Sequence, residues 1–95
     1  MKLRLRAAAV RDMDGIFDYS LARHGEAAAE AYARDLYAAM ERLLDFPELG
    51  AARDDLRPRL RNLPCSEHRI FYQVKGSTIS VARVLHKAMD VRRHL

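Results

Sequence analysis

The chain has 95 residues, of which 49% are hydrophobic and 32% are charged, a composition that fits one modest globular domain and excludes a disordered tail. Its single cysteine excludes an internal disulfide, and no apolar run is long enough for a membrane span or a signal segment. We therefore expect one domain, residues 1–95, in the reducing cytoplasm.

The net charge of +4 is unevenly distributed along the chain. Residues 1–50 carry seven Lys or Arg against nine Asp or Glu, a balance of −2, whereas residues 51–95 carry ten against four, a balance of +6. Positive charge concentrated in one half suits a negatively charged partner, which is nucleic acid, an acidic protein surface or an acidic segment. The charge alone does not choose among these three.

The first half of the chain predicts one strand followed by two helices. Strict alternation of leucine and basic residues in KLRLR, residues 2–6, predicts a short strand with one polar face. From Ala7 the apolar residues recur at three and four, which predicts a helix that ends at Gly25. A second amphipathic stripe predicts a helix over residues 26–46, ended by Pro47, and the two helices form an antiparallel hairpin.

The first predicted helix separates its apolar and acidic residues. Its apolar stripe consists of Ala9, Met13, Ile16, Phe17 and Leu21. The acidic residues Asp12, Asp14 and Asp18 are expected to lie mostly off this stripe.

The second half predicts three strands. Alternation in LRPRLRN, residues 56–62, predicts an edge strand, because Pro58 cannot donate a hydrogen bond to a ladder. Residues 68–74 and 78–86 predict a hairpin whose three-residue loop uses Gly76 at positive φ. The C-terminal tail fits either a helical turn or a last strand. The order β-α-α-β-β-β predicts a two-layer α+β fold, with the helical hairpin packed on one face of an antiparallel sheet.

Arg83 stands out in the last predicted strand. The period of two places it on one face with Ile79, Val81 and Leu85, which is costly unless the arginine is paired or a bulge turns it outward. Asp90 is the acidic residue nearest to it in sequence. Arg83 is therefore either a structural, ion-paired residue or a surface contact with a target.

Other polar residues have two interpretations each. The basic stripe Arg57, Arg59 and Arg61 either protects an edge strand from pairing with another sheet or binds a partner. His86 either carries a proton or is held by a hydrogen bond at a strand end. No cluster has the spacing of a metal site and no glycine-rich loop would hold a phosphate, so we expect no metal and no cofactor.

Four stretches, in this order, carry a resemblance to a known family: DMDGIFDYSLARHG, AEAYARDLYAAMERLLDFPELG, LRPRLRNLPCSEHRIFYQV and ISVARVLHKAMDVRRHL. Together they cover nearly the whole chain, and they resemble the ParE toxins of bacterial toxin–antitoxin modules, within the RelE/ParE superfamily. The last stretch is the most specific, since the run from Arg83 to His86 is followed by Met89 and Asp90. Two positions depart from the family pattern: Glu67, where a small residue is common, and Gln73, where arginine is common.

The resemblance implies the same two-layer fold and a cytoplasmic toxin that poisons DNA gyrase and blocks replication, held inactive by a cognate ParD-like antitoxin. Members of the RelE branch instead cut messenger RNA on the ribosome, for which Arg61, Arg69 and His86 would be the residues here. A third possibility is a non-toxic module that only binds its antitoxin. We favour the gyrase inhibitor, because no acid–base pair is apparent and a net charge of +4 is mild for work among ribosomal phosphates.

The partner and site predictions follow from this choice. We expect no membrane partner, no sequence-specific binding of nucleic acid and no catalytic residue. An amphipathic antitoxin segment is expected to bind exposed apolar residues at the helix edges, namely Leu36, Leu44 and Leu49. The residues predicted to bind the target lie on the basic sheet half and the C-terminal segment: Arg61, Arg69, Arg83, His86, Arg92 and Arg93.

Overall fold

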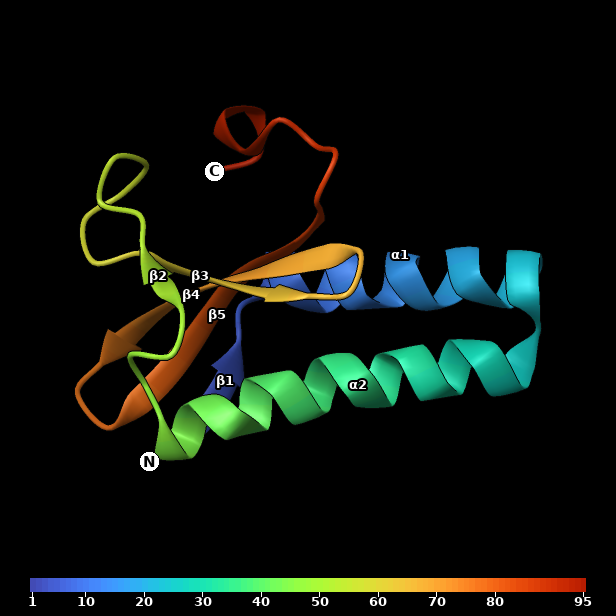
Figure 1. Cartoon of the computed structure of the whole chain (residues 1–95), viewed down its shortest axis with the longest axis horizontal. Helices are drawn as coiled ribbons and strands as arrows, with labels where there is room; N and C mark the ends of the chain where they lie inside the picture. Colours follow the sequence, from blue (N-terminus) through green and yellow to red (C-terminus); the bar gives the residue numbers. More distant parts are fainter.

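The computed structural model describes all residues from 1 to 95. A helical hairpin lies on one face of a five-stranded sheet whose order is β1-β5-β4-β3-β2 (Figure 1). In chain order the elements are β1 (Lys2–Leu5), α1 (Ala7–His24), α2 (Glu26–Asp45), β2 (Ala51–Ala52), β3 (Arg61–Cys65), β4 (His68–Lys75), β5 (Thr78–His86) and a short 3-10 turn, η1 (Val91–Arg93). None of the helices combines the length and the apolar character that a membrane span requires.

Both helices form where the sequence predicts them. Gly25 makes the corner between them with φ of 86°, and its N–H donates to the carbonyl of Leu21 at 3.1 Å, which closes the last turn of α1. α2 ends at Asp45, two residues before Pro47, as expected for a residue that cannot continue a helix. The tip of this hairpin extends beyond the sheet, so only the other end of each helix packs on the strands (Figure 1).

The main core lies between the helices and the sheet. Its members from the helices and from the strands are almost completely shielded from solvent, and Leu3 and Leu5 of β1 pack against them, as the alternation of this strand predicted. The buried members of this core are Ala9, Met13, Leu36, Met40, Leu43, Ile70, Tyr72, Ile79, Val81 and Val84.

A second, smaller core lies on the opposite face of the sheet. Leu60, Phe71, Ala82 and Leu85 form it, and it is covered by Leu56 of the loop before β3 together with Val91 and Leu95 of the C-terminal segment. The face of the sheet opposite the helical hairpin is therefore partly covered. The ambiguous tail is a helical turn that packs there rather than a last strand.

The sheet differs from the prediction in the direction of one strand, in the position of another, and in a short fifth strand, β2, that the sequence did not predict. β1 pairs with β5 in parallel, with Lys2 opposite Thr78, so the sheet is mixed. The predicted strand over residues 56–62 is wrong for all but its last two residues. Residues 53–60 form a loop in which Arg59 has φ of 61°, and β3 begins at Arg61. The leucines of this segment alternate, but they pack into the second core from a loop held by hydrogen bonds of its own.

Two side-chain contacts fix that loop. The carboxylate of Asp54 accepts a hydrogen bond from the N–H of Arg59 at 2.8 Å, and the side-chain amide of Gln73 donates to the carbonyl of Pro58 at 2.9 Å. Gln73, which departs from the family pattern, thus ties the loop to the centre of β4. The adjoining β4–β5 hairpin uses Gly76 at φ of 59°, as predicted, although its loop has two residues rather than three.

A β-bulge in β5 changes which face each side chain takes. Phe71 pairs with Arg83 while Tyr72 pairs with Val81, so Ala82 is the extra residue. Beyond this point the alternation is inverted, and Arg83 shares the face of Phe71 and the second core rather than the face of Val81. The bulge is one of the two ways of accommodating Arg83 that the sequence left open.

Tyr72 connects the main core to the loop that follows α2. Its hydroxyl donates to the carbonyl of Pro47 at 2.7 Å and accepts from the N–H of Gly50 at 2.9 Å. A Cβ on Gly50 would lie 2.7 Å from a ring carbon of Tyr72 and 2.9 Å from the carbonyl oxygen of Asn62. Only glycine therefore allows this loop to approach the sheet so closely.

We expect Gly50→Ala to lower the free energy of unfolding by about 1–3 kcal/mol, because buried ring and backbone atoms must move to admit the methyl group. Gly15→Ala is the matched control: it lies within α1 with nothing near its Cβ position, and we expect it to stabilise the protein by about 0.5–1 kcal/mol. Urea unfolding measures both. Equal stabilities of the two variants would contradict the close approach at Gly50.

Candidate functional site

Arg83 is held by a bidentate ion pair inside the protein. Its Nε and Nη2 donate to the two carboxylate oxygens of Asp12 at 2.8 and 2.9 Å, and its Nη1 donates to the carbonyl of His94 at 2.7 Å. The same carboxylate accepts from the N–H of Val84 at 2.9 Å. The hydrogen bonds that the Arg83 guanidinium donates to Asp12 hold its pKa above the usual value. These contacts join α1, β5 and the C-terminal segment.

The prediction that Arg83 is ion-paired is confirmed, but its partner is Asp12 rather than Asp90. Asp90 instead accepts a hydrogen bond from the N–H of Arg92 at 3.1 Å and so begins the turn η1. Asp12 is 71 residues away in sequence, and its side chain is only 13% exposed. The signal for this role was its position three residues after Ala9 and one before Met13, which places it at the border of the apolar stripe rather than off it.

Arg61 and Arg69 have different surroundings. The Nη1 of Arg61 donates to the carbonyls of Gly50 and Glu48 at 2.7 and 3.3 Å, on the side of the sheet where Tyr72 holds the same loop. Arg69 is the cross-strand neighbour of Leu85, a member of the second core on the opposite face. The structure therefore does not bring Arg61 and Arg69 together.

His86 belongs to a cluster that the sequence did not predict. The hydroxyl of Tyr32 lies 2.6 Å from Nδ1 of His68, and the rings of His68 and His86 meet edge to face with centroids 5.3 Å apart. Nδ1 of His86 accepts from the N–H of Ala88 at 3.0 Å, so the expected backbone hydrogen bond is present. Tyr32 comes from α2 and His68 from β4, and no local pattern connects residues 36 positions apart.

Burial shifts the pKa values of two members of this cluster, His68 and Tyr32. Burial, and secondarily the neighbouring His86, lowers the pKa of His68. Burial raises the pKa of Tyr32, whose hydroxyl also accepts from the N–H of Glu67 at 3.2 Å. A phenol with a raised pKa is poorly suited to act as a general base at neutral pH, because efficient proton transfer needs a pKa near the working pH.

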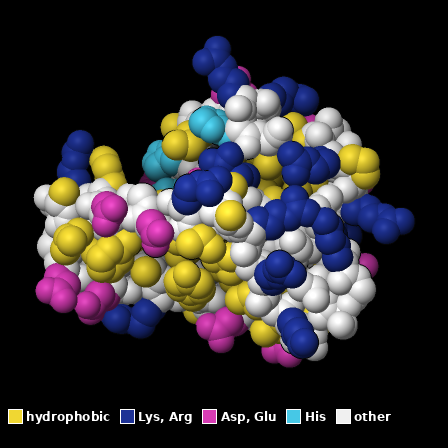
Figure 2. Space-filling model, turned by 180° about the vertical axis from the view of Figure 1, so that it is seen from behind, with side chains coloured by type: hydrophobic (Ala, Val, Ile, Leu, Met, Phe, Trp, Pro, Cys, Tyr) yellow, Lys and Arg dark blue, Asp and Glu magenta, His cyan; other side chains and the backbone are white.

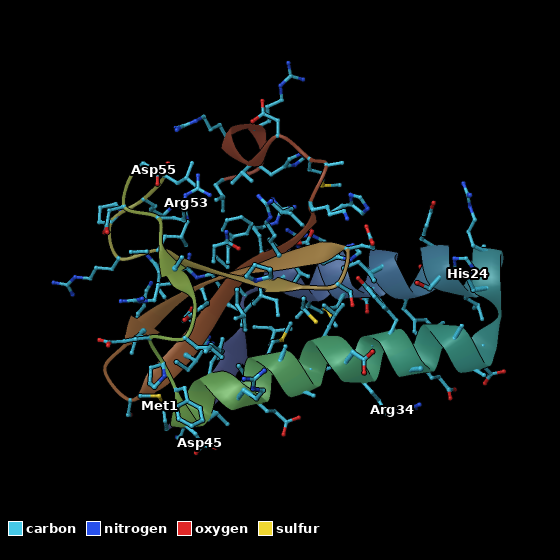
Figure 3. The ribbon with its side chains drawn as sticks, viewed as in Figure 1. Met1, His24, Arg34, Asp45, Arg53 and Asp55 are labelled. Atoms are coloured by element: carbon cyan, nitrogen blue, oxygen red, sulfur yellow. The ribbon has the colours of Figure 1, made fainter.

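The last two predicted target-binding residues, Arg92 and Arg93, are exposed, and each pairs with a surface carboxylate, Asp55 at 3.4 Å and Asp90 at 3.7 Å. The side chains of Arg92 and Arg93 are 67% and 83% exposed. Arg92 and Arg53 both contact the carboxylate of Asp55, at 3.4 and 3.0 Å, so the C-terminal turn lies beside the loop that carries Arg53 and Asp55 (Figure 3). We call Arg53, Arg92 and Arg93 the C-terminal basic surface. Lysine and arginine side chains gather over this sheet half of the molecule, away from the tip of the hairpin (Figure 2).

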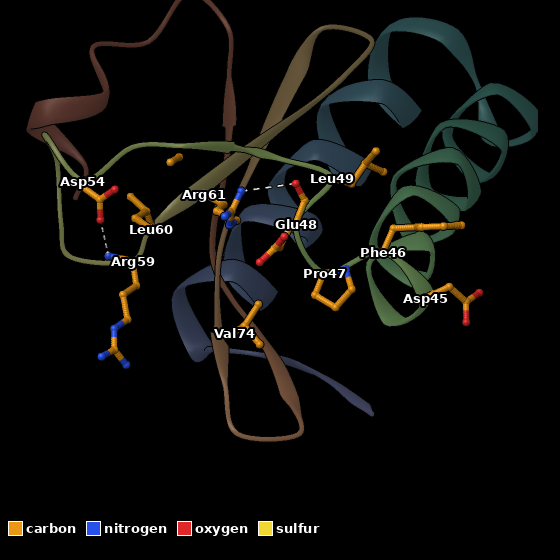
Figure 4. A pocket seen from close by; sticks show the side chains of 11 residues that line it. Asp45, Phe46, Pro47, Glu48, Leu49, Asp54, Arg59, Leu60, Arg61 and Val74 are labelled. Atoms are coloured by element: carbon orange, nitrogen blue, oxygen red, sulfur yellow. Dashed lines mark hydrogen bonds between the residues drawn. The ribbon is translucent and has the colours of Figure 1, made fainter.

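The predicted antitoxin-binding leucines divide into three cases. Leu36 has no exposed surface, so its prediction as an exposed contact is wrong: it lies at the centre of the stripe that faces the sheet. Leu44 is half-buried against the main core, whereas Leu49 is 41% exposed. Leu49 and Phe46, which is 61% exposed, line a hollow of about 770 Å³ between the end of α2 and the loop before β3 (Figure 4).

Comparison with known proteins identifies the family of this chain. The family model described as the ParE toxin of the type II toxin–antitoxin system parDE matches residues 3–91. The chain belongs to the ParE toxin family. The match begins in β1 and ends at the first residue of η1, so it spans both α-helices and the strands except Lys2.

Individual relatives cover almost the same length. Toxin ParE1 of Mycobacterium tuberculosis H37Rv is 42% identical over 92 residues, which are 96% of this chain and 94% of that protein. Toxin ParE1 of Caulobacter vibrioides is 38% identical over 97% of this chain and 95% of its own. A chain of the chromosomal ParDE system from P. aeruginosa superimposes with a TM-score of 0.79 at 25% identity, over 90% of this chain and 95% of that one. The predicted α+β fold class is confirmed.

The half-buried His68 predicts how the stability of the protein depends on pH. Its folded-state pKa is lower than the value of 6.5 for a free histidine, so the stability that its neutral form contributes is complete above pH 6.5 and is lost as the pH falls through the folded pKa. The free energy of unfolding should therefore decrease on acidification below pH 6.5, and His68→Gln should flatten this part of the curve. Chemical unfolding at a series of pH values measures it, with the exposed His94→Gln as control. An unchanged slope in His68→Gln would contradict the assignment.

Proposed function

We propose that this protein is the toxin of a type II toxin–antitoxin system, that it inhibits DNA gyrase by binding rather than by catalysis, and that a cognate ParD-type antitoxin neutralises it. The observation that carries the proposal is the family match across residues 3–91, which includes the stretch from Arg83 to Met89 on which the resemblance to gyrase-poisoning toxins is most specific.

The arrangement of polar residues supports binding over ribonuclease chemistry. Cleavage through a 2′-hydroxyl needs a base, an acid and a group that stabilises the developing charge, all close to one phosphate. Arg61 and Arg69 lie on opposite faces of the sheet, and Nδ1 of His86 is occupied by a backbone N–H. The residues that the ribonuclease alternative requires therefore do not share one site.

The C-terminal basic surface is the proposed contact with gyrase. Arg92 and Arg93 are the most exposed of the predicted target-binding arginines, and Val91 and Leu95 anchor their turn in the second core. Arg83 takes part indirectly, because it holds the carbonyl of His94 rather than facing outward. Exposed cations at the edge of an interface mainly accelerate association with an acidic surface.

The hollow beside Phe46 and Leu49 is the proposed site for the antitoxin. The neighbouring solved structure is described as a ParDE system, which supports a ParD-type partner for this chain too. Two exposed apolar side chains beside a concavity suit one anchor of an amphipathic segment that folds when it binds. Leu49 belongs to this proposed site, whereas Leu44 does not line the hollow and stays a separate prediction; Leu36 is excluded because it is buried.

A supercoiling assay with purified gyrase tests the proposal. The wild-type protein should inhibit supercoiling, and the cognate antitoxin should restore it. The double variant Arg92→Gln/Arg93→Gln should need roughly tenfold more protein for the same inhibition, since it loses two cations of the contact. Arg34→Gln/Arg42→Gln is the control with the same charge change. It alters exposed residues of α2, and Arg34 projects from the outer side of that helix (Figure 3).

Two results would contradict the proposal. One is unchanged supercoiling in the presence of a large excess of folded protein. The other is codon-specific cleavage of messenger RNA after induction in cells, which would assign the chain to the ribonuclease branch.

A further inference from the structure

A second basic site lies at the opposite end of the sheet from the C-terminal surface. A hollow of about 500 Å³ opens where β1 leads into α1, beside the β4–β5 hairpin. No acidic residue lines it. Its polar lining consists of Arg4, Arg6, Lys75, Thr78 and Ser80, and Ala7 contributes the first residue of α1.

The side chains that line this hollow are unused within the protein. The ion pairs of the molecule involve other cations, so Arg4, Arg6 and Lys75 have no carboxylate partner. The hydroxyls of Thr78 and Ser80 make no hydrogen bond within the protein. The protein thus presents three cations and two hydroxyl donors without internal acceptors.

Ser80 is the most informative of these residues, because it is only 7% exposed and yet unpaired. Buried polar side chains are normally hydrogen-bonded. The single unpaired side-chain atom that is completely enclosed is Oδ1 of Asn62, so the Ser80 oxygen retains a small accessible area. Since Ser80 lines the hollow, that oxygen is available to a ligand there.

The start of α1 contributes further positive potential. Arg6 occupies the cap position without a side-chain cap, and the first turn contains no acidic residue. The first N–H groups of a helix have no acceptor within the helix, and the dipole of an 18-residue helix places partial positive charge at this end. Uncapped backbone donors, three cations and the Ser80 hydroxyl together form an environment for an anion with several acceptor oxygens.

We propose that this hollow binds a phosphate group, and that the phosphate belongs to the backbone of double-stranded DNA. The proposal rests on the proposed function, because a gyrase inhibitor works on an enzyme that holds DNA. The toxin would then contact both components: gyrase through the C-terminal basic surface, and DNA through the start of β1 and α1. Contacts to phosphates require no particular base sequence.

The composition of the hollow favours DNA over an acidic protein. Protein interfaces have an apolar centre, whereas interfaces with DNA are more polar and strongly positive. Of the large apolar side chains exposed on the molecule, only Met1 before β1 and Val10 at the start of α1 are close in sequence to the residues of this site. Moreover, Lys2, Arg4 and Arg6 follow one another at about 7 Å along one side of β1, which suits a series of phosphates.

Binding of a short fluorescent DNA duplex, followed by anisotropy in the absence of gyrase, tests the proposal. Three phosphate contacts give a slope of roughly −3 in log affinity against log salt concentration. Arg4→Gln should weaken binding about tenfold at low salt and reduce the slope by about one. Ser80→Ala should also weaken binding although it leaves the charge unchanged. Arg34→Gln, with the same charge loss outside the hollow, should bind like the wild type.

A titration with inorganic phosphate, followed by the backbone amide signals of Ala7 and Ser80 in nuclear magnetic resonance, gives an independent readout of the site. Both signals should shift with phosphate and with the duplex. Circular dichroism of each variant checks that it is folded.

Several results would overturn the proposal. Equal weakening by Arg4→Gln and Arg34→Gln would mean that binding is only general attraction. Shifts with phosphate but no binding of the duplex would assign the site to a small phosphorylated molecule. Tighter binding of polyglutamate than of DNA would assign it to an acidic protein. Because gyrase is absent from these measurements, their failure would leave the supercoiling result intact, and a negative supercoiling result would leave DNA binding standing.

Discussion

The ion pair between Asp12 and Arg83 is the constraint on which the rest of the structure depends. β1 pairs only with the first part of β5, up to Val81, so the second part of β5 has no strand on that side. Asp12 of α1 takes the place of the missing strand. Its carboxylate accepts hydrogen bonds from the N–H of Val84 and from Nε and Nη2 of Arg83. One carboxylate thus closes the edge of the sheet and fastens the helical layer to it.

Arg83 also connects the ion pair to the C-terminal segment. Its third contact, to the carbonyl of His94, holds the segment whose Val91 and Leu95 cover the second core. The arginines of the basic half therefore have separate roles. Arg61 and Arg83 hold the fold together by pairing with internal acceptors. In contrast, Arg92 and Arg93 of the C-terminal basic surface, and Arg4 and Lys75 of the hollow, have exposed side chains.

The sequence predicted those helices and strands whose conformation is set mainly by residues close to one another in the chain. The periods of three to four and of two, together with Gly25 and Pro47 as stop signals, located both helices, β1 and the β4–β5 hairpin. The loop before β3 was predicted as a strand, because Leu56 and Leu60 alternate as they would in one. Their packing into a core that includes Val91 and Leu95 depends on the distant C-terminus, which no local window contains.

The candidate site was harder to predict, because its contacts join residues that are far apart in the sequence. The extra residue Ala82 inverts the alternation of β5, so the face of Arg83 could not be obtained by counting in twos. Its partner Asp12 and the contact between Tyr32 and His68 connect elements far apart in sequence. Membership of the ParE family was accessible from the sequence because the motif order covers the whole chain, but the division between structural and exposed arginines required the fold.

A double-mutant cycle of Asp12→Asn and Arg83→Met measures the central interaction most directly. Asparagine keeps an acceptor for the N–H of Val84 and methionine keeps an apolar stem, so the cycle isolates the ion pair. Each single variant should lose about 2–3 kcal/mol of unfolding free energy, because it leaves a partly buried partner without its counterpart. The double variant should lose about 2 kcal/mol less than the sum of the two. Additive losses, with a coupling energy near zero, would contradict the role of this pair as the link between α1, β5 and the C-terminal segment.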